Sequence, residues 1–123
     1  MALDRETFAK LARDDFEFTR ETRYFTGTIK LEIGDETWAL NFEDGALASV
    51  TDTPGGEVKV VVGGTAEQWE ELLQTKPRPF YQCIQSAAVK EGMQITNTNE
   101  TFAYLPALNR MTTLLRQMKN GRA

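Results

Sequence analysis

The stretch TIKLEIGDETWALNFEDGALASVT, residues 28–51, contains the turns that decide the fold. Apolar and polar residues alternate over 29–33 and again over 38–42, which is the period of a strand with one buried face. Gly34-Asp35 interrupts the alternation as a two-residue loop compatible with a type II′ turn, and Asp44-Gly45 is typical of a type I′ turn. The sequence therefore predicts two successive antiparallel hairpins.

The two loops also determine which residues share a face of the predicted sheet. Pairing across the first loop sets Leu31 opposite Trp38, and pairing across the second sets Leu40 opposite Ser49. Because directly paired residues share a face, the two hairpins independently give the same apolar face. That face is predicted to carry Ile29, Leu31, Trp38, Leu40, Phe42 and Leu47.

Two further strands and a helix are predicted next along the chain. Residues 47–51 and 58–62 are the expected third and fourth strands, so we expect a curved meander whose apolar face is covered by helices. Thr65 and Gln68 have the spacing of a capping box, in which each side chain accepts a hydrogen bond from the backbone N–H of the other residue. This pattern predicts a helix to about residue 73.

The last third of the chain is predicted to add two helices and a short strand. Pro79 suits the first turn of a helix that Gly92 ends, and residues 93–96 form the expected fifth strand. A final helix should begin at Pro106 and run to about Lys119, with apolar groups over an arc of about 160° instead of the roughly 100° of a surface helix. Either this helix also borders a cavity or a partner, or it is simply well buried.

The N-terminal segment has a different pattern from the rest. Residues 4–14 place apolar groups at helical spacing among charges of both signs, which predicts a short amphipathic helix. The residues from 16 to 23 are interpreted as a connector. We therefore expect one domain overall, with an N-terminal helix and connector at 1–23 and the main body at 24–123.

The composition is typical of a soluble globular protein of 123 residues, with 41% hydrophobic and 26% charged residues. A net charge of -4 argues against nucleic acid as a partner, because phosphate neutralisation needs a clustered basic surface. No apolar run approaches the ~18 residues of a membrane span, and the N-terminus lacks a signal-peptide core. These features lead us to expect a cytoplasmic protein.

The sequence offers little for catalysis. It contains no histidine, which removes Ser-His and Cys-His nucleophile pairs and histidine metal ligands. Adjacent carboxylates such as Asp14-Asp15 point in different directions and are predicted to be solvated. Cys83 is predicted to be a small buried hydrophobe, and the C-terminal cations, among them Arg110 and Arg116, to solvate the final helix. We expect no catalytic residue, no metal and no cofactor.

The order of these features resembles the sterol carrier protein type two family. The resemblance rests on the Asp44-Gly45 hairpin, the 58–62 strand, the step Gly63-Gly64-Thr65 into a helix with Trp69, and the Leu-rich final helix; it covers roughly residues 24–118. It implies an α+β fold, a five-stranded, mainly antiparallel sheet with helices covering one face and an apolar tunnel beneath them. Family members bind and transfer sterols, fatty acyl chains and other lipids without covalent catalysis, and the fold also serves as an accessory domain of larger enzymes.

The resemblance and the apolar faces together predict a cavity for a lipid or another hydrophobic small molecule. The sheet would form its floor, the later helices its walls and lid, and Asn97, Asn99 or Gln82 would orient a head group. The predicted ligand-binding residues are Ile29, Leu31, Trp38, Leu40, Phe42, Leu47, Phe80, Ile84, Leu108, Met111, Leu115 and Met118.

Two other classes of function remain open. The wide apolar face of the final helix also suits a protein-interaction, oligomerisation or accessory module, including a homodimer, and transient contact with a membrane is compatible with the C-terminal cations. A carboxylate-based isomerase or hydrolase would need an acid inside the cavity, and the inward positions hold none. If the helix borders a cavity, a charged residue at Met111 or Leu115 should abolish ligand uptake more than folding.

Overall fold

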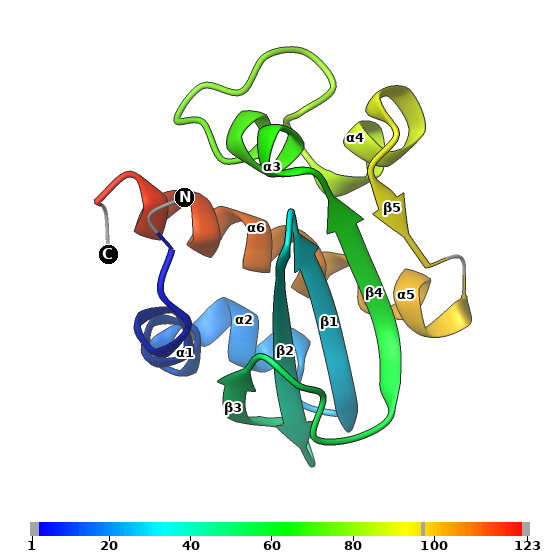
Figure 1. Cartoon of the computed structure of the whole chain (residues 1–123). Coiled ribbons are helices and arrows are strands. Elements are labelled where there is room, and N and C mark those ends of the chain that lie inside the picture. The colour runs from blue at the N-terminus through cyan, green and yellow to red at the C-terminus, as the bar shows by residue number, and fades with distance from the viewer. Residues whose placement is uncertain (1–2, 97, 122–123) are drawn as a thin grey trace.

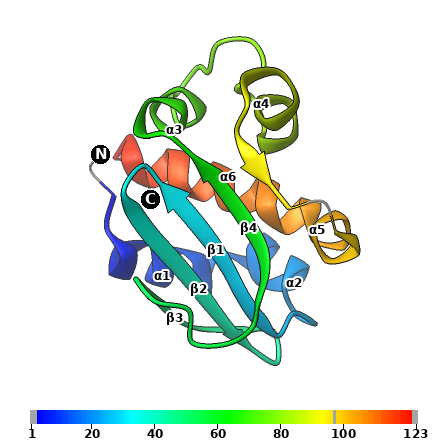
Figure 2. The ribbon, with the colours of Figure 1, turned by 45° about the vertical axis from the view of Figure 1, so that its right-hand side comes forward.

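The computed structural model describes residues 3–96 and 98–121 as an α+β fold built on one five-stranded sheet. Helices α2 and α6 lie behind the sheet in Figure 1, Figure 2 shows α1 behind it as well, and α3 and α4 lie beyond one end of it. In chain order the elements are α1 (Arg5–Asp14), α2 (Phe16–Glu21), β1 (Gly27–Ile33), β2 (Glu36–Glu43), β3 (Ala46–Thr51), β4 (Val58–Gly64), α3 (Ala66–Leu72), α4 (Ile84–Glu91), β5 (Gln94–Ile95), α5 (Asn99–Ala103) and α6 (Leu105–Lys119).

Both predicted hairpins are present. β1 and β2 are antiparallel with Leu31 opposite Trp38, as their two-residue loop predicted. At the second loop, Asp44 and Gly45 have φ angles of 51° and 83°, and two consecutive positive values are those of a type I′ turn. The local turn chemistry therefore specifies the central part of the sheet.

The register between β2 and β3 differs from the prediction by one residue. Leu40 lies opposite Val50 and not opposite Ser49, because the register shifts between Asn41 and Phe42. Such a bulge adds a residue to one strand and leaves its backbone groups partly unpaired. Here Arg13 of α1 donates to the carbonyl oxygens of Leu47 and Ala48, at 2.9 and 2.8 Å.

The predicted meander is wrong in the position of β4. The strand order is β3-β2-β1-β4-β5, and β4 runs parallel to β1, with Ile29 opposite Val60. The connection from β3 therefore passes over the outer face of the sheet, where the backbone N–H of Gly55 donates to Asn41 Oδ1 at 2.8 Å. Placed between β1 and β5, β4 buries Val60 and Val62 completely. Alternation along a strand predicts its faces but not its neighbours.

In the C-terminal half, one helix begins later than predicted and another was not predicted. Helix α4 begins at Ile84 instead of Pro79, and Phe80 lies before it with a φ of 73° and 46% exposure. The short helix α5 was not predicted; Thr98 caps its N-terminus by accepting from the N–H of Thr101 at 3.2 Å. The capping box at α3, the end of α4 at Gly92 and the extent of α6 agree with prediction.

The predicted connector before the sheet contains the helix α2. Asp15 caps it by accepting from the backbone N–H of Phe18 at 2.8 Å. The same carboxylate binds Arg110 of α6 through two bonds of 2.8 and 3.0 Å, so neither charge is solvated as the sequence suggested. Phe8 of α1 and Phe18 of α2 belong to the main apolar cluster, and the division at residue 23 stays a prediction.

We expect Asp15→Asn to destabilise the fold by about 2 kcal/mol, because asparagine keeps the helix cap but loses the ion pair with Arg110. The Arg110 guanidinium, which donates to Asp15, lowers the pKa of that carboxyl. Its contribution is therefore present above an unfolded-state pKa of about 3.9 and is lost as the pH falls through the lower folded-state pKa. Urea unfolding of both proteins from pH 7 to pH 3 should show the difference shrinking only at the acidic end. A difference independent of pH would contradict this assignment.

We expect Gly45→Ala to cost more than about 3 kcal/mol, since a Cβ there would overlap the backbone carbonyl group of Arg23. The matched control is Gly92→Ala, which has a similar φ of 79° but no atom closer to the new Cβ than Gln68 Nε2 at 4.0 Å. That control should lower the free energy of unfolding by only about 1–2 kcal/mol, the cost of placing alanine in the left-handed region. Equal losses in thermal unfolding would show that the Arg23 contact is unimportant.

Candidate functional site

The structure brings most of the predicted ligand-binding residues together. Ten of the twelve lie in one contiguous cluster between the sheet and the helices, and none of these ten is more than 9% exposed. Phe80 does not join them, because the chain before α4 turns it outward, and Met118 is only half-buried at the edge of the cluster. Whether these residues line a ligand cavity stays a prediction.

Aromatic side chains fill the cluster beside α1 and α2. The Trp38 ring lies 6.0 Å from that of Phe8, and the Phe42 ring contacts both Phe18 and Phe25, at 6.2 and 5.3 Å between centroids. In this conformation the side chains of sheet and helices contact one another directly. A ligand in this layer would therefore have to displace side chains that now touch.

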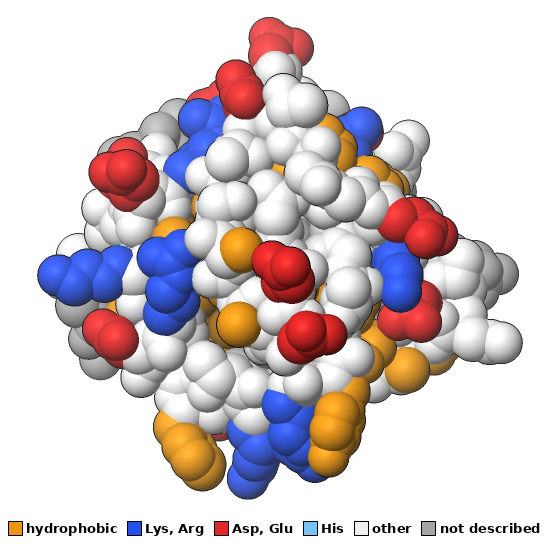
Figure 3. All heavy atoms as spheres, turned by 90° about the horizontal axis from the view of Figure 1, so that it is seen from below, with side chains coloured by type: hydrophobic (Ala, Val, Ile, Leu, Met, Phe, Trp, Pro, Cys, Tyr) orange, Lys and Arg blue, Asp and Glu red, His pale blue; other side chains and the backbone are white. Residues whose placement is uncertain are grey.

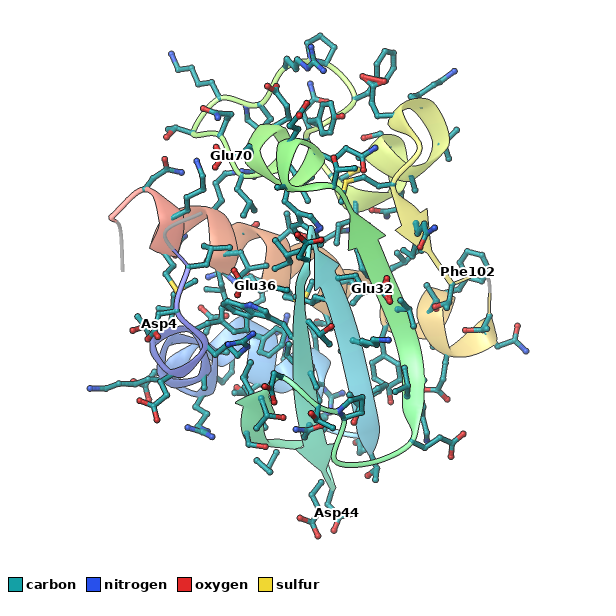
Figure 4. The ribbon with its side chains drawn as sticks, in the orientation of Figure 1. Asp4, Glu32, Glu36, Asp44, Glu70 and Phe102 are labelled. Carbon is teal, nitrogen blue, oxygen red and sulfur yellow. The ribbon has the colours of Figure 1, made fainter. Side chains whose placement is uncertain are left out.

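An apolar groove opens at the other side of the molecule, between α4, β5, α5 and the start of α6. It has a volume of about 220 Å³. Two of its side chains are strongly exposed, Val89 at 78% and Phe102 at 58%, and Figure 4 shows Phe102 on α5 pointing away from the sheet. The groove is lined by Gln85, Ala88, Val89, Ile95, Thr96, Thr101, Phe102 and Leu105.

A few polar atoms lie in this otherwise apolar groove. The hydroxyl groups of Thr96 and Thr101 are 2.7 Å apart and hydrogen-bond to each other. Gln85 Oε1 is buried and has no hydrogen-bond partner among the described residues. Sequence reasoning missed the groove because α5 was not predicted; the capping residue Thr98 just before Phe102 was the signal that could have revealed it.

The predicted head-group residues lie elsewhere. Gln82 is exposed and accepts from the backbone N–H of Phe80 at 2.9 Å, Asn99 is the exposed first residue of α5, and Asn97 lies outside the described residues. Cys83 is half-buried at the N-cap of α4 and not inside the core as predicted. Burial raises the pKa of its thiol, but hydrogen bonds with Ser86 and with the backbone outweigh this, so the pKa is lowered.

Two exposed aromatic residues lie near the two ends of α2. Phe16 and Tyr24 are 77% and 79% exposed, and the guanidinium groups of Arg20 and Arg23 lie over their respective rings, at 5.9 and 4.9 Å. Figure 3 shows such a grouping, with basic side chains between hydrophobic ones along the lower edge of that face.

The described residues supply no obvious chemistry of another kind. No group of three or more His, Cys, Asp or Glu side chains among them comes close enough to hold a metal ion. None of the helices in 3–96 and 98–121 has the length and apolar character needed to cross a membrane.

Comparison with known proteins identifies the fold. No protein-family model matches the chain, and no curated protein matches its sequence. A crystal structure of sterol carrier protein 2 superposes with a TM-score of 0.68 over 91% of this chain and 92% of that one, at 13% identity. A conserved hypothetical protein of Thermus thermophilus, described as possibly a sterol carrier protein, gives 0.63 over 95% and 90%, at 16% identity. UbiJ-SCP2, a ubiquinone synthesis protein, gives 0.55 over 88% and 90%, at 12% identity.

The likeness extends over nearly the whole length of each of these proteins, and at such low identities it establishes the fold alone. The five-stranded sheet, with one parallel and three antiparallel strand pairs, agrees with the architecture that the sequence resemblance implied. The chain has the sterol carrier protein 2 fold.

Proposed function

We propose that this protein binds a lipid or similar apolar ligand and carries it without covalent catalysis. The observation that carries the proposal is the likeness to sterol carrier protein 2 over about nine-tenths of both chains. The single-sided apolar layer between the sheet and α6 supports it, because that layer is the main hydrophobic cluster among the described residues. Buried methylene groups would supply about 0.8 kcal/mol each.

The groove between α4 and α5 is the proposed way in for the ligand. It is almost wholly apolar, it is open to solvent, and its inner wall is formed by Ile95 and Leu105, which pack against the main cluster. Gln85 Oε1, which has no partner among the described residues, would accept a hydrogen bond from a hydroxyl group of a ligand passing through the groove. Separation of α4 and α5 would extend the groove into the cluster.

The direct test is native mass spectrometry of protein purified gently from cells, followed by organic extraction. An adduct of lipid mass that extraction removes and added fatty acid or sterol restores is the expected result. A ligand-free mass that stays unchanged across a panel of lipids would overturn the proposal.

An accessory role is the second candidate function. The direct contacts between the side chains of the sheet and the helices favour it, because a ligand in that layer would have to displace them. UbiJ-SCP2, a ubiquinone synthesis protein, has the same fold. The exposed Phe16 and Tyr24 would then meet a partner protein or a second copy of this chain. Light scattering after size exclusion, with and without Phe16→Ser, separates the roles: a dimer lost in the variant supports the accessory role, and a monomer in both removes the second-copy form.

We expect Val89→Ser and Phe102→Ser each to weaken binding of a fluorescent fatty acid about fivefold, equivalent to about 1 kcal/mol. Both side chains are exposed, so the free energy of unfolding should change by less than about 0.5 kcal/mol. Phe16→Ser is the control, because it removes an even more exposed aromatic group far along the chain from the groove. Unchanged affinity in both groove variants would show that the bound ligand does not contact the groove.

We expect Leu115→Ala to lose about 2–5 kcal/mol of stability and to regain part of it when lipid is added. The control Leu73→Ala makes the same change at another fully buried position that is not among the predicted ligand-binding residues, so lipid should not rescue it. Thermal unfolding with and without oleate measures both. Equal rescue would show that the ligand does not occupy the space beside Leu115.

A charged residue at Met111 or Leu115 would not separate ligand uptake from folding. Both side chains are fully buried, so the charge would unfold the protein.

A further inference from the structure

Arg116 on α6 is bound to the end of α3 in a way that uses only part of its guanidinium group. Its Nε and Nη2 donate to the carbonyl oxygen of Leu72, at 3.2 and 2.6 Å, and Nη2 also reaches the carbonyl of Gln82 at 3.5 Å. These bonds cap the C-terminal end of α3, where a cation is favoured. Nη1 donates to no group of the described residues.

No carboxylate of the described residues neutralises this cation. The two nearest acids along α3 are already paired, Glu70 with Lys119 at 3.5 Å and Glu71 with Arg78 at 3.0 Å. Burial lowers the pKa of Arg116, and no negative charge offsets this effect. By contrast, the pKa of Arg110, which is bound to Asp15, is raised. Arg116 is therefore a half-buried positive charge whose hydrogen-bond partners, within the described part of the chain, are all neutral carbonyl groups.

Arg116 lines a pocket of about 210 Å³ between the last turns of α6 and the loop after α3. Thr75, Thr113, Gln117 and Asn120 complete its lining. Asn120 Nδ2 is occupied by the carbonyl oxygens of Leu73 and Arg116, whereas the Gln117 amide and the Thr75 hydroxyl donate to nothing among the described residues. The pocket thus combines a cation with two further free donors and holds no acid among its lining residues.

We propose that this pocket binds an anionic group, a carboxylate or a phosphate, and that its source is the head group of an amphiphile. Such a group would accept from Arg116 Nη1 and from the free donors of Gln117 and Thr75, in bonds that charge strengthens. The volume suits a head group and not a whole lipid. The amphiphile part rests on the proposed function: the Leu72 and Leu115 side chains, next to the pocket along the chain, lie in the main cluster and would meet the ligand's tail.

A capping role alone does not account for the pocket. Capping explains the bonds from Nε and Nη2, and a single carbonyl would suffice for it. It leaves Nη1 without an acceptor among the described residues and does not explain why four more polar residues line the pocket together with Arg116. An anion bound there would supply the negative charge that the described residues lack.

Calorimetric titration with oleate, oleyl alcohol and inorganic phosphate tests the proposal, using the full chain, Arg116→Gln, and Arg78→Gln as the control. Arg78 carries the same charge near the same end of the molecule but is exposed and does not line the pocket. The original protein and the control should bind oleate about tenfold more tightly than oleyl alcohol, a difference of about 1.4 kcal/mol. Arg116→Gln should lose this preference and keep its affinity for the alcohol. Gln117→Leu leaves the bonds from Arg116 to Leu72 intact and should also weaken the binding of oleate. It is the test variant if Arg116→Gln does not fold.

The possible outcomes separate the two proposals. Equal affinity for oleate and oleyl alcohol in the original protein, or equal loss of both ligands in Arg116→Gln, would overturn the anion pocket while leaving lipid binding in place. If neither lipid binds but phosphate does, and Arg116→Gln abolishes that, the pocket stands as a site for a free anion and the carrier function fails. Binding of none of the three ligands would overturn both.

Discussion

Burial of one face of the sheet is the constraint on which the rest of the structure depends. Ile29, Leu31 and Val60 on the adjacent strands β1 and β4 form an apolar layer that loses contact with water only when helices cover it. The chain supplies that cover from both of its ends, α1 and α2 before the sheet and α6 after it. The Asp15–Arg110 ion pair joins these two parts of the cover across 95 residues.

The sequence was sufficient for features that depend on neighbouring residues. The Asp44-Gly45 turn, the faces of β1 and β2 and the capping box at Thr65 all follow from side chains a few positions apart. The sequence was insufficient for features that depend on contacts between residues far apart in the chain. The place of β4 depends on a loop held by Asn41, and Asp15 was assigned to solvent because its partner Arg110 is remote in the chain.

For the candidate site, the sequence predicts which residues are buried but not whether they enclose a cavity. Periodicity assigned Leu40, Leu108 and Leu115 to the interior, and they are fully buried. A residue that lines a cavity and one that packs against a neighbour follow the same pattern of alternation, so no sequence argument separates a tunnel from a filled core. The groove beside Phe102 and the pocket at Arg116 arise from contacts between elements far apart in the sequence, and neither carries a local motif.

The bond from Arg13 to the bulge of β3 has a consequence for how this protein behaves when it is damaged. An outer strand with free carbonyl groups can template a strand from another molecule and so start a fibre. Arg13 occupies two of those acceptors, and the opposite edge of the sheet, β5, is only two residues long. Resistance to polymerisation therefore depends on α1 remaining docked. A protease that cuts before β1 would release α1 and leave the carbonyl groups of the β3 edge free to pair with a strand of another molecule.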